Sequence, residues 1–192
     1  MQPHVQGCPT IVVDQAITRA AIEFCQKTGV WRYDHVPVAA VEATTAYSFA
    51  PPDGAKVERV LAAWLDGVPL TVKNATDLLG VDDWKTATGT PTHLVVLNDT
   101  QFRLYPLGAG SVDLTVTLKP SRAATTIDDA IFEAHVDAIA DGAIGKLAAL
   151  PGKPWSSADL VTYHTGEFDK AIDDATIREF QHAPMRTANP PL

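Results

Sequence analysis

The chain is poor in cysteine: Cys8 and Cys25 are the only two in 192 residues, and they form no C-x-x-C pair. This excludes a zinc ribbon and a dithiol redox motif. No apolar run approaches the roughly 20 residues that span a bilayer. The first residues also lack the basic and apolar regions of a secretory signal peptide. We therefore expect an intracellular origin and no membrane contact.

Basic residues are also scarce, with 15 Lys and Arg against 23 Asp and Glu, a formal net charge of −8. Proteins that bind nucleic acid through phosphate neutralisation need a basic surface, so this class is disfavoured. Hydrophobic residues make up 46% of the chain and charged residues 20%, which is typical of a globular protein. The length allows one domain or two small ones.

Motifs for chemistry are missing as well. None of the six histidines belongs to an H-E-x-x-H motif or has a histidine partner at helical spacing, and no G-x-S-x-G elbow occurs. Residues 142–147 superficially resemble a phosphate loop, but the spacing is wrong and the segment lies in a helical pattern. His135 and His164, on adjacent predicted helices, are the one pair that could meet. We expect no catalytic residue, no metal site and no cofactor.

Three helices are predicted from apolar residues that recur every three or four positions. The first covers residues 10–28 and ends at Gly29, where a left-handed cap is expected. Cys25 lies in its apolar stripe and is predicted to be buried. The second follows the capping pair Thr126 and Asp129, and the third follows Ser156 and Asp159. The short connection between these two predicts an antiparallel helical hairpin.

Residues between the first two helices show β patterning instead. Val112, Leu114, Val116 and Leu118 alternate strictly with polar residues. Asp66-Gly67 and Asn98-Asp99 separate β-like runs and predict hairpins. A short helical turn is expected at residues 75–79. The region predicts a small antiparallel sheet, barrel or sandwich of about six strands.

These patterns predict an α+β fold. Residues 1–33 and 121–183 are expected to form a three-helix unit, made of the N-terminal helix and the C-terminal hairpin. Residues 34–120 form an inserted β domain, and residues 184–192 an extended tail. Glycines in the helical regions, at positions 142, 145 and 166, are expected to permit close helix contacts.

One charge pattern is unusual. Four acidic residues recur at i+4 and would stack on one face of a helix over roughly 18 Å; they are Asp129, Glu133, Asp137 and Asp141. Like charges at this spacing destabilise a helix. The row is either a solvated outer face or an acidic surface that meets a basic partner or repels a passing polyanion.

The proline-bounded tail is the second candidate surface. It is either a disordered end or an arm that becomes ordered in a groove on a partner. The candidate contact residues are Pro184, Met185, Arg186, Pro190, Pro191 and Leu192.

A series of short segments resembles the head-to-tail adaptor (connector) proteins of tailed bacteriophages. The opening segment has Glu23-Phe24-Cys25 followed by Thr28 and Trp31-Arg32. The later pieces keep the family's order: Tyr47-Ser48-Phe49, Pro52-x-Gly54-Ala55-x-Val57, Leu65-Asp66-Gly67, Gly89-x-Pro91, Phe102-Arg103-Leu104-Tyr105-Pro106 and Leu150-Pro151-Gly152-Lys153-Pro154-Trp155-Ser156. The resemblance covers nearly the whole chain.

The resemblance implies a virion structural protein in the neck, between head and tail. Such proteins form a ring, commonly of twelve subunits, beneath the portal protein and around the channel for the genomic DNA. Their helical parts and C-terminal segments contact the portal, and their β parts meet the next neck or tail protein. An acidic lumen would let DNA slide through without specific binding. By position, residues 184–192 would be the portal-facing arm.

Two other functions remain open from the residues alone. A small glycan-cleaving hydrolase could use paired carboxylates such as Asp128 or Glu133. A carbohydrate- or peptide-binding module could use Trp64, Trp84 and Tyr105 as an aromatic platform.

Overall fold

The computed structural model describes residues 5–42, 44–126 and 128–182. The fold is α+β, with three helices and a seven-stranded, mostly antiparallel sheet. Contacts divide the chain into two compact units, which are described separately. The helical unit comprises residues 1–30 and 129–192, and the β unit comprises residues 31–128.

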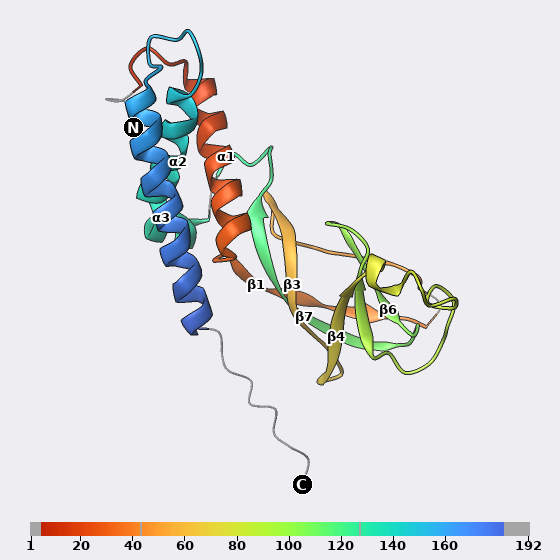
Figure 1. Ribbon diagram of the computed structural model, residues 1–192. Coiled ribbons are helices and arrows are strands. Elements are labelled where there is room, and N and C mark those ends of the chain that lie inside the picture. Colours follow the sequence, from red (N-terminus) through yellow and green to blue (C-terminus); the bar gives the residue numbers. More distant parts are fainter. Residues whose placement is uncertain (1–4, 43, 127, 183–192) are drawn as a thin grey trace. The chain divides into compact units, whose positions relative to one another are not determined.

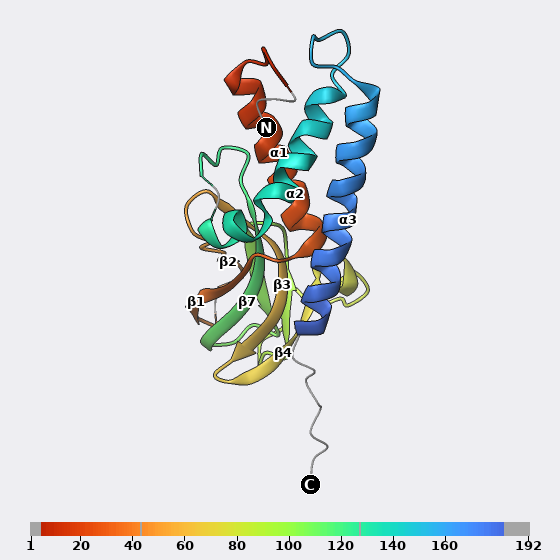
Figure 2. The same ribbon diagram turned by 90° about the vertical axis from the view of Figure 1, so that its left-hand side faces the viewer.

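The helical unit contains α1 (Thr10–Thr28), α2 (Asp129–Ala148) and α3 (Ala158–His182). Each helix contacts the other two, and they lie side by side in Figure 2. Helix α1 has the predicted bounds. Gly29 adopts φ 68° and donates its N–H to the carbonyl of Cys25, which confirms the expected cap. Cys25 is fully buried, as predicted, and burial raises the pKa of its thiol to about 12.

The start of α3 differs slightly from the prediction. Ser157, not Ser156, is the capping residue, since the N–H of Leu160 donates to its hydroxyl over 3.3 Å. Ser156 instead donates its hydroxyl to the carbonyl of Leu150 and accepts the N–H of Lys153. This serine therefore closes the turn between the two helices.

Two of the three helical glycines allow close packing, as predicted. A Cβ on Gly142 would lie 2.8 Å from the ring of Phe168, and one on Gly145 would lie 3.0 Å from the Thr165 hydroxyl. For Gly166 the prediction was wrong, because nothing lies within 4 Å of its Cβ position. The core of this unit includes Phe24, Phe168, Ile172 and Ala175.

The β unit consists of seven strands in the order β1-β7-β3-β4-β5-β6-β2 (Figure 1). Their bounds are β1 (Arg32–Ala40), β2 (Tyr47–Ser48), β3 (Ala55–Leu65), β4 (Val68–Asn74), β5 (His93–Val96), β6 (Gln101–Tyr105) and β7 (Gly110–Pro120). The predicted turn at Asp66-Gly67 joins β3 to β4. Both of its residues have positive φ, 49° and 81°, the geometry that matches strand twist. The Asn98-Asp99 hairpin joins β5 to β6, also as predicted.

The sheet is mostly antiparallel, as predicted, but β4 and β5 pair in parallel. A parallel pair needs a crossover, and residues 75–92 provide it. The crossover begins with the expected turn, a 3-10 helix (Ala75–Leu78) closed by a capping box between Asn74 and Asp77.

The two edge strands of the sheet are joined through side chains. The hydroxyl of Tyr47, on β2, donates to the carbonyl of Val41 and accepts its N–H, over 2.9 and 2.8 Å. The imidazole of His35, on β1, accepts the N–H of Ala50 over 2.7 Å and lies 2.6 Å from the carbonyl of Val36. Both bonds require the neutral tautomer that carries its proton on Nδ1. These contacts satisfy backbone groups where the ladder ends.

Candidate interaction surfaces

The predicted acidic row does not run straight along α2. His135 lies inside the helix with φ −136° and ψ 17°, well outside helical values. Asp129 and Glu133 precede this bend, and Asp137 and Asp141 follow it. The expected single face was therefore wrong in its geometry, because the bend interrupts the i+4 repeat. Whether these residues face a partner or a channel remains a prediction.

The four carboxylates also differ in their surroundings. Asp129, Glu133 and Asp137 are exposed, whereas Asp141 is partly buried. An oxygen of Asp141 lies 2.7 Å from Nδ1 of His164, whose side chain is 6% exposed on α3. Asp141 is thus part of the contact between α2 and α3. Three members of the predicted row remain available to an approaching molecule.

His135 and His164, the two histidines that could have met, contact different residues. His135 packs its ring on Phe24 of α1, with ring centroids 4.8 Å apart, while His164 pairs with Asp141. Within the part of the chain that the structure describes, no three His, Cys, Asp or Glu side chains are grouped as metal ligands.

A charged cluster that the sequence did not suggest joins α1 to α2 and α3. Glu23 lies 2.5 Å from the ammonium of Lys146 on α2 and 2.8 Å from that of Lys27. Lys27 also lies 3.9 Å from Asp169 on α3. Burial raises the pKa of Glu23, but the two ammonium groups outweigh it, so the pKa is lowered overall. The i,i+4 spacing of Glu23 and Lys27 was visible in the sequence, whereas the link to Lys146 depends on packing.

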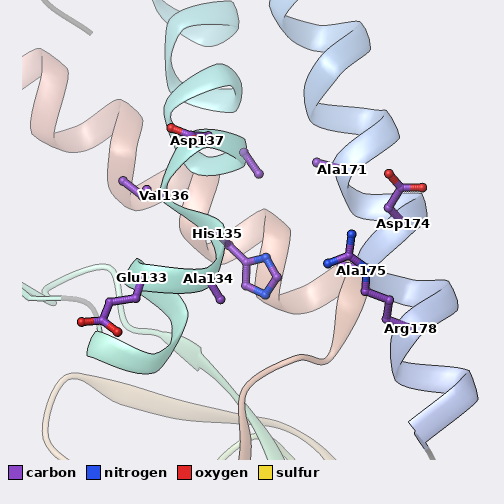
Figure 3. Close-up of a pocket in the computed structure, with 10 residues that line it drawn as sticks. Glu133, Ala134, His135, Val136, Asp137, Ala171, Asp174, Ala175 and Arg178 are labelled. Atoms are coloured by element: carbon purple, nitrogen blue, oxygen red, sulfur yellow. The ribbon is translucent and has the colours of Figure 1, made fainter.

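A cavity of about 180 Å³ lies beside the bend, between α2 and α3. Figure 3 shows His135 and Arg178 pointing toward one another across it. Burial lowers the pKa of His135, the nearby Arg178 lowers it further, and Glu179 acts in the opposite direction. The imidazole is therefore held in its neutral form.

The proposed hydrolase pair does not have the surroundings of a general acid. Asp128 and Glu133 are both exposed. A carboxyl group that works as a general acid near neutral pH is normally kept protonated by burial in an apolar pocket. Glu133 lines the cavity between α2 and α3, but its side chain is exposed, and so is that of Asp128, so neither carboxyl is buried in this way.

The aromatic platform was wrong in its placement of Trp84. This side chain is 8% exposed and packs with Leu78 and Val95. The guanidinium of Arg103 covers its ring, with Cζ 5.1 Å from the centroid, and donates to the carbonyl of Lys85 over 2.8 Å. Tyr105 packs on the same cluster. Trp84 therefore holds the crossover onto the sheet and offers no open stacking face.

A groove of the β unit lies at the tip of the β3–β4 hairpin. A cavity of about 430 Å³ is lined there by residues that include Glu42, Asp66, Val68 and Pro91. Val68 is 63% exposed. Close backbone approach shapes the rim, because a Cβ on Gly108 would lie 2.5 Å from the carbonyl of Gly89. The groove offers apolar contact flanked by two carboxylates.

Comparison with known proteins identifies the family. The model of the SU10 adaptor protein family matches residues 7–190, nearly the whole chain. The chain belongs to the SU10 adaptor protein family. This confirms the resemblance to phage head-to-tail adaptors, and it makes the protein a structural adaptor and a component of the virion. The search of curated proteins gave no match.

The adaptor assignment agrees with the surfaces described above. They consist of exposed carboxylates, a groove at the β3–β4 tip and exposed apolar side chains. Among the described residues, no helix combines the length and apolar character of a membrane span. The tail residues Pro184, Met185, Arg186, Pro190, Pro191 and Leu192 lie outside the described residues, so their role remains a prediction.

Proposed function

We propose that the protein forms a ring in the phage neck, between the portal protein and the next neck or tail protein, with the genomic DNA passing through its centre. The observation that carries the proposal is the match to the SU10 adaptor family over residues 7–190. A ring commonly has twelve subunits in head-to-tail adaptors, and we propose the same number here. The protein acts by contact and not by catalysis.

A ring requires two different faces on each subunit, because the same heterologous contact repeats around the circle. Both units expose apolar side chains that such contacts could cover. They are Ile11, Phe132, Tyr163 and Ile177 on the helical unit, and Val36, Val41, Leu61, Val68 and Leu79 on the β unit. Apolar surface at the centre of an interface supplies much of the affinity of stable assemblies.

The negative charge suits a channel for DNA. Each subunit contributes a net −8, and a ring multiplies that charge around the lumen. A negative wall repels phosphates and leaves the DNA free to slide. The exposed carboxylates of Asp129, Glu133 and Asp137 are the proposed lumen-facing or partner-facing groups.

Charge reversal tests this role. Glu133→Lys with Asp137→Lys should slow DNA exit or retain DNA in assembled necks, because two positive charges per subunit would bind phosphates. The matched control reverses two exposed carboxylates of the β unit, Asp53 and Asp82. Equal DNA release by both double variants and the unmodified protein would show that the acidic residues of α2 form only a solvated face. Asp141 is left intact because it pairs with His164.

Residues 184–192 are the proposed portal-facing arm. Three prolines among its last nine residues disfavour a helix and suit an extended segment in a groove. Deleting residues 184–192 should weaken binding to purified portal, measured by co-sedimentation, while the thermal unfolding of the subunit stays unchanged. Undiminished portal binding by the truncated protein would overturn the proposed role of residues 184–192.

The β unit is the proposed contact for the downstream neck or tail protein. Its groove at the β3–β4 tip combines exposed Val68 with the carboxylates of Glu42 and Asp66. The unit is rigidly built, with its edge strands joined through His35 and Tyr47. A rigid platform presents such a groove at low entropic cost.

A further inference from the structure

Helix α2 bends where its sequence gives no local reason to bend. Sharp bends in helices normally come from proline, from glycine or serine pairs, from an inserted residue or from an intruding side chain. The segment Asp129–Ala148 contains no proline, and its glycines at 142 and 145 lie well beyond the bend. The non-helical residue is His135. Tertiary contacts must therefore hold the bend.

The bend has a contact on one side and free space on the other. The imidazole of His135 packs on Phe24 of α1, with centroids 4.8 Å apart and the rings tilted by 45°. Toward α3 lies the cavity of about 180 Å³, whose lining includes small side chains such as Ala134, Ala171 and Ala175 (Figure 3). The alanines leave space for the backbone at the bend to move, and Arg178 is the large side chain that would have to yield.

Charged residues lie near the imidazole on two of the three helices. Arg178 points toward it from α3, where Asp174 also lines the cavity and Glu179 raises its pKa, and Glu133 and Asp137 precede and follow it on α2. From α1 the residue that packs against it is the uncharged Phe24. Burial and Arg178 lower the pKa of His135 more than Glu179 raises it. The bent form therefore contains a neutral imidazole.

We propose that α2 is a hinge at His135: a bent form keeps the neutral imidazole on Phe24, a straight form releases it to water, and acidification shifts the helix toward the straight form. A group whose pKa is depressed in one form favours that form above its ordinary pKa and loses this contribution as the pH falls through the lowered value. The bent form is thus favoured at neutral pH, and its population falls in acid.

The straight form has a second property. It restores the i+4 repeat through His135, so that the carboxylates of Asp129, Glu133, Asp137 and Asp141 again form one row. Like charges at this spacing repel, which further favours the bend at neutral pH. The hinge therefore couples protonation of one half-buried ring to the continuity of the acidic surface. The inference does not depend on the proposed function.

Two spin labels across the bend test the hinge in the full-length chain. Exposed Phe132 and exposed Ala149, which directly follows α2 and still donates its N–H to the carbonyl of Gly145, are each changed to cysteine, and Cys8 to serine. Cys25 stays unlabelled because it is fully buried and the pKa of its thiol is about 12. In a straight helix, 17 residues span about 26 Å. Electron-electron distance measurements should show a shorter separation at pH 8 and a growing population near 26 Å as the pH falls to 5.

The matched control carries His135→Phe, which keeps a ring for Phe24 and cannot take a proton. Its distance distribution should be the same at pH 8 and pH 5. An unchanged distribution in the protein that retains His135 overturns the hinge. An equal shift in both proteins also overturns it, because the carboxylates would then be responsible.

A second measurement keeps the test decisive if the phenylalanine variant fails to fold. The titration midpoint of the His135 imidazole, followed by NMR in the protein with the native His135, should coincide with the midpoint of the distance change. Coincident midpoints support the hinge. Separate midpoints contradict it.

Discussion

The glycines at the contact between α2 and α3 give a sharp prediction about stability. Gly142→Ala places a methyl group 2.8 Å from two carbons of the Phe168 ring and 3.0 Å from a third. Ordinary van der Waals contacts between carbons lie at about 3.5–4.0 Å. The ring must therefore shift by roughly 0.7–1.2 Å. Phe168 is 3% exposed and packs on Phe24, so little space is available for that movement.

The magnitude follows from two opposing effects. Replacing glycine by alanine in a helix interior stabilises the helix by about 1 kcal/mol. Overpacking a well-filled core costs about 1–3 kcal/mol. The net effect of Gly142→Ala is thus a loss of roughly 1 kcal/mol in the free energy of unfolding. Gly166→Ala is the matched control, because nothing lies within 4 Å of its Cβ, and it should gain about 1 kcal/mol.

Urea unfolding followed by circular dichroism at 222 nm measures both variants, since this signal reports mainly the three helices. Equal slopes in urea would show that the midpoints can be compared directly. We expect Gly142→Ala to unfold earlier than the unmodified protein and Gly166→Ala later, with a difference of roughly 2 kcal/mol between them. The packing argument is refuted if Gly142→Ala is as stable as Gly166→Ala.

Two further predictions concern single side chains. His35→Phe keeps the ring but removes the acceptor for the N–H of Ala50, and should lower the free energy of unfolding in urea by about 1–3 kcal/mol. The control is the same change at part-exposed His93, which is bonded to a surface threonine and should lose far less stability. Equal losses in the two variants would contradict the role of His35. Lys146→Met removes one of the two ammonium groups that lower the pKa of Glu23. A carboxyl group with a lowered pKa stabilises the fold above its ordinary pKa near 4.5, and this contribution is lost as the pH falls. The unmodified protein should therefore have a higher melting temperature than Lys146→Met at pH 6, and the difference should be smaller at pH 3.5. A difference that is the same at both pH values would contradict the ion pair.

Local signals in the sequence were enough for several elements. Helix α1 was predicted with its observed bounds, because an unbroken apolar stripe ends at a glycine suited to a left-handed cap. The Asp66-Gly67 turn and the alternating strand that became β7 were also predicted. In each case neighbouring residues decide the structure, through backbone preference or through alternation of apolar and polar side chains.

Features set by packing between distant residues were not predicted. The apolar repeat from Phe132 to Leu150 passes through His135 without interruption, so nothing local indicated the bend against Phe24. The parallel pairing of β4 with β5 depends on where a crossover of 18 residues returns to the sheet. The bond between Asp141 and His164 depends on the register of α2 against α3.

Part of the candidate surface was likewise predicted from the sequence, and part was not. The acidic residues of α2 were visible from their spacing, but their true arrangement followed only from the bend and from the burial of Asp141. The adaptor family was recognised from the order of short segments along the chain and confirmed by the family model. No single residue carries that identity, because adaptors work through extended surfaces.

The proposed ring on the portal can be observed directly by electron microscopy. Negative-stain images of purified portal mixed with the full-length protein test it most directly. We expect a rotationally symmetric collar of added density at one end of the portal, which is absent from images of portal alone. Portal particles that remain bare at a saturating concentration of the protein would contradict it.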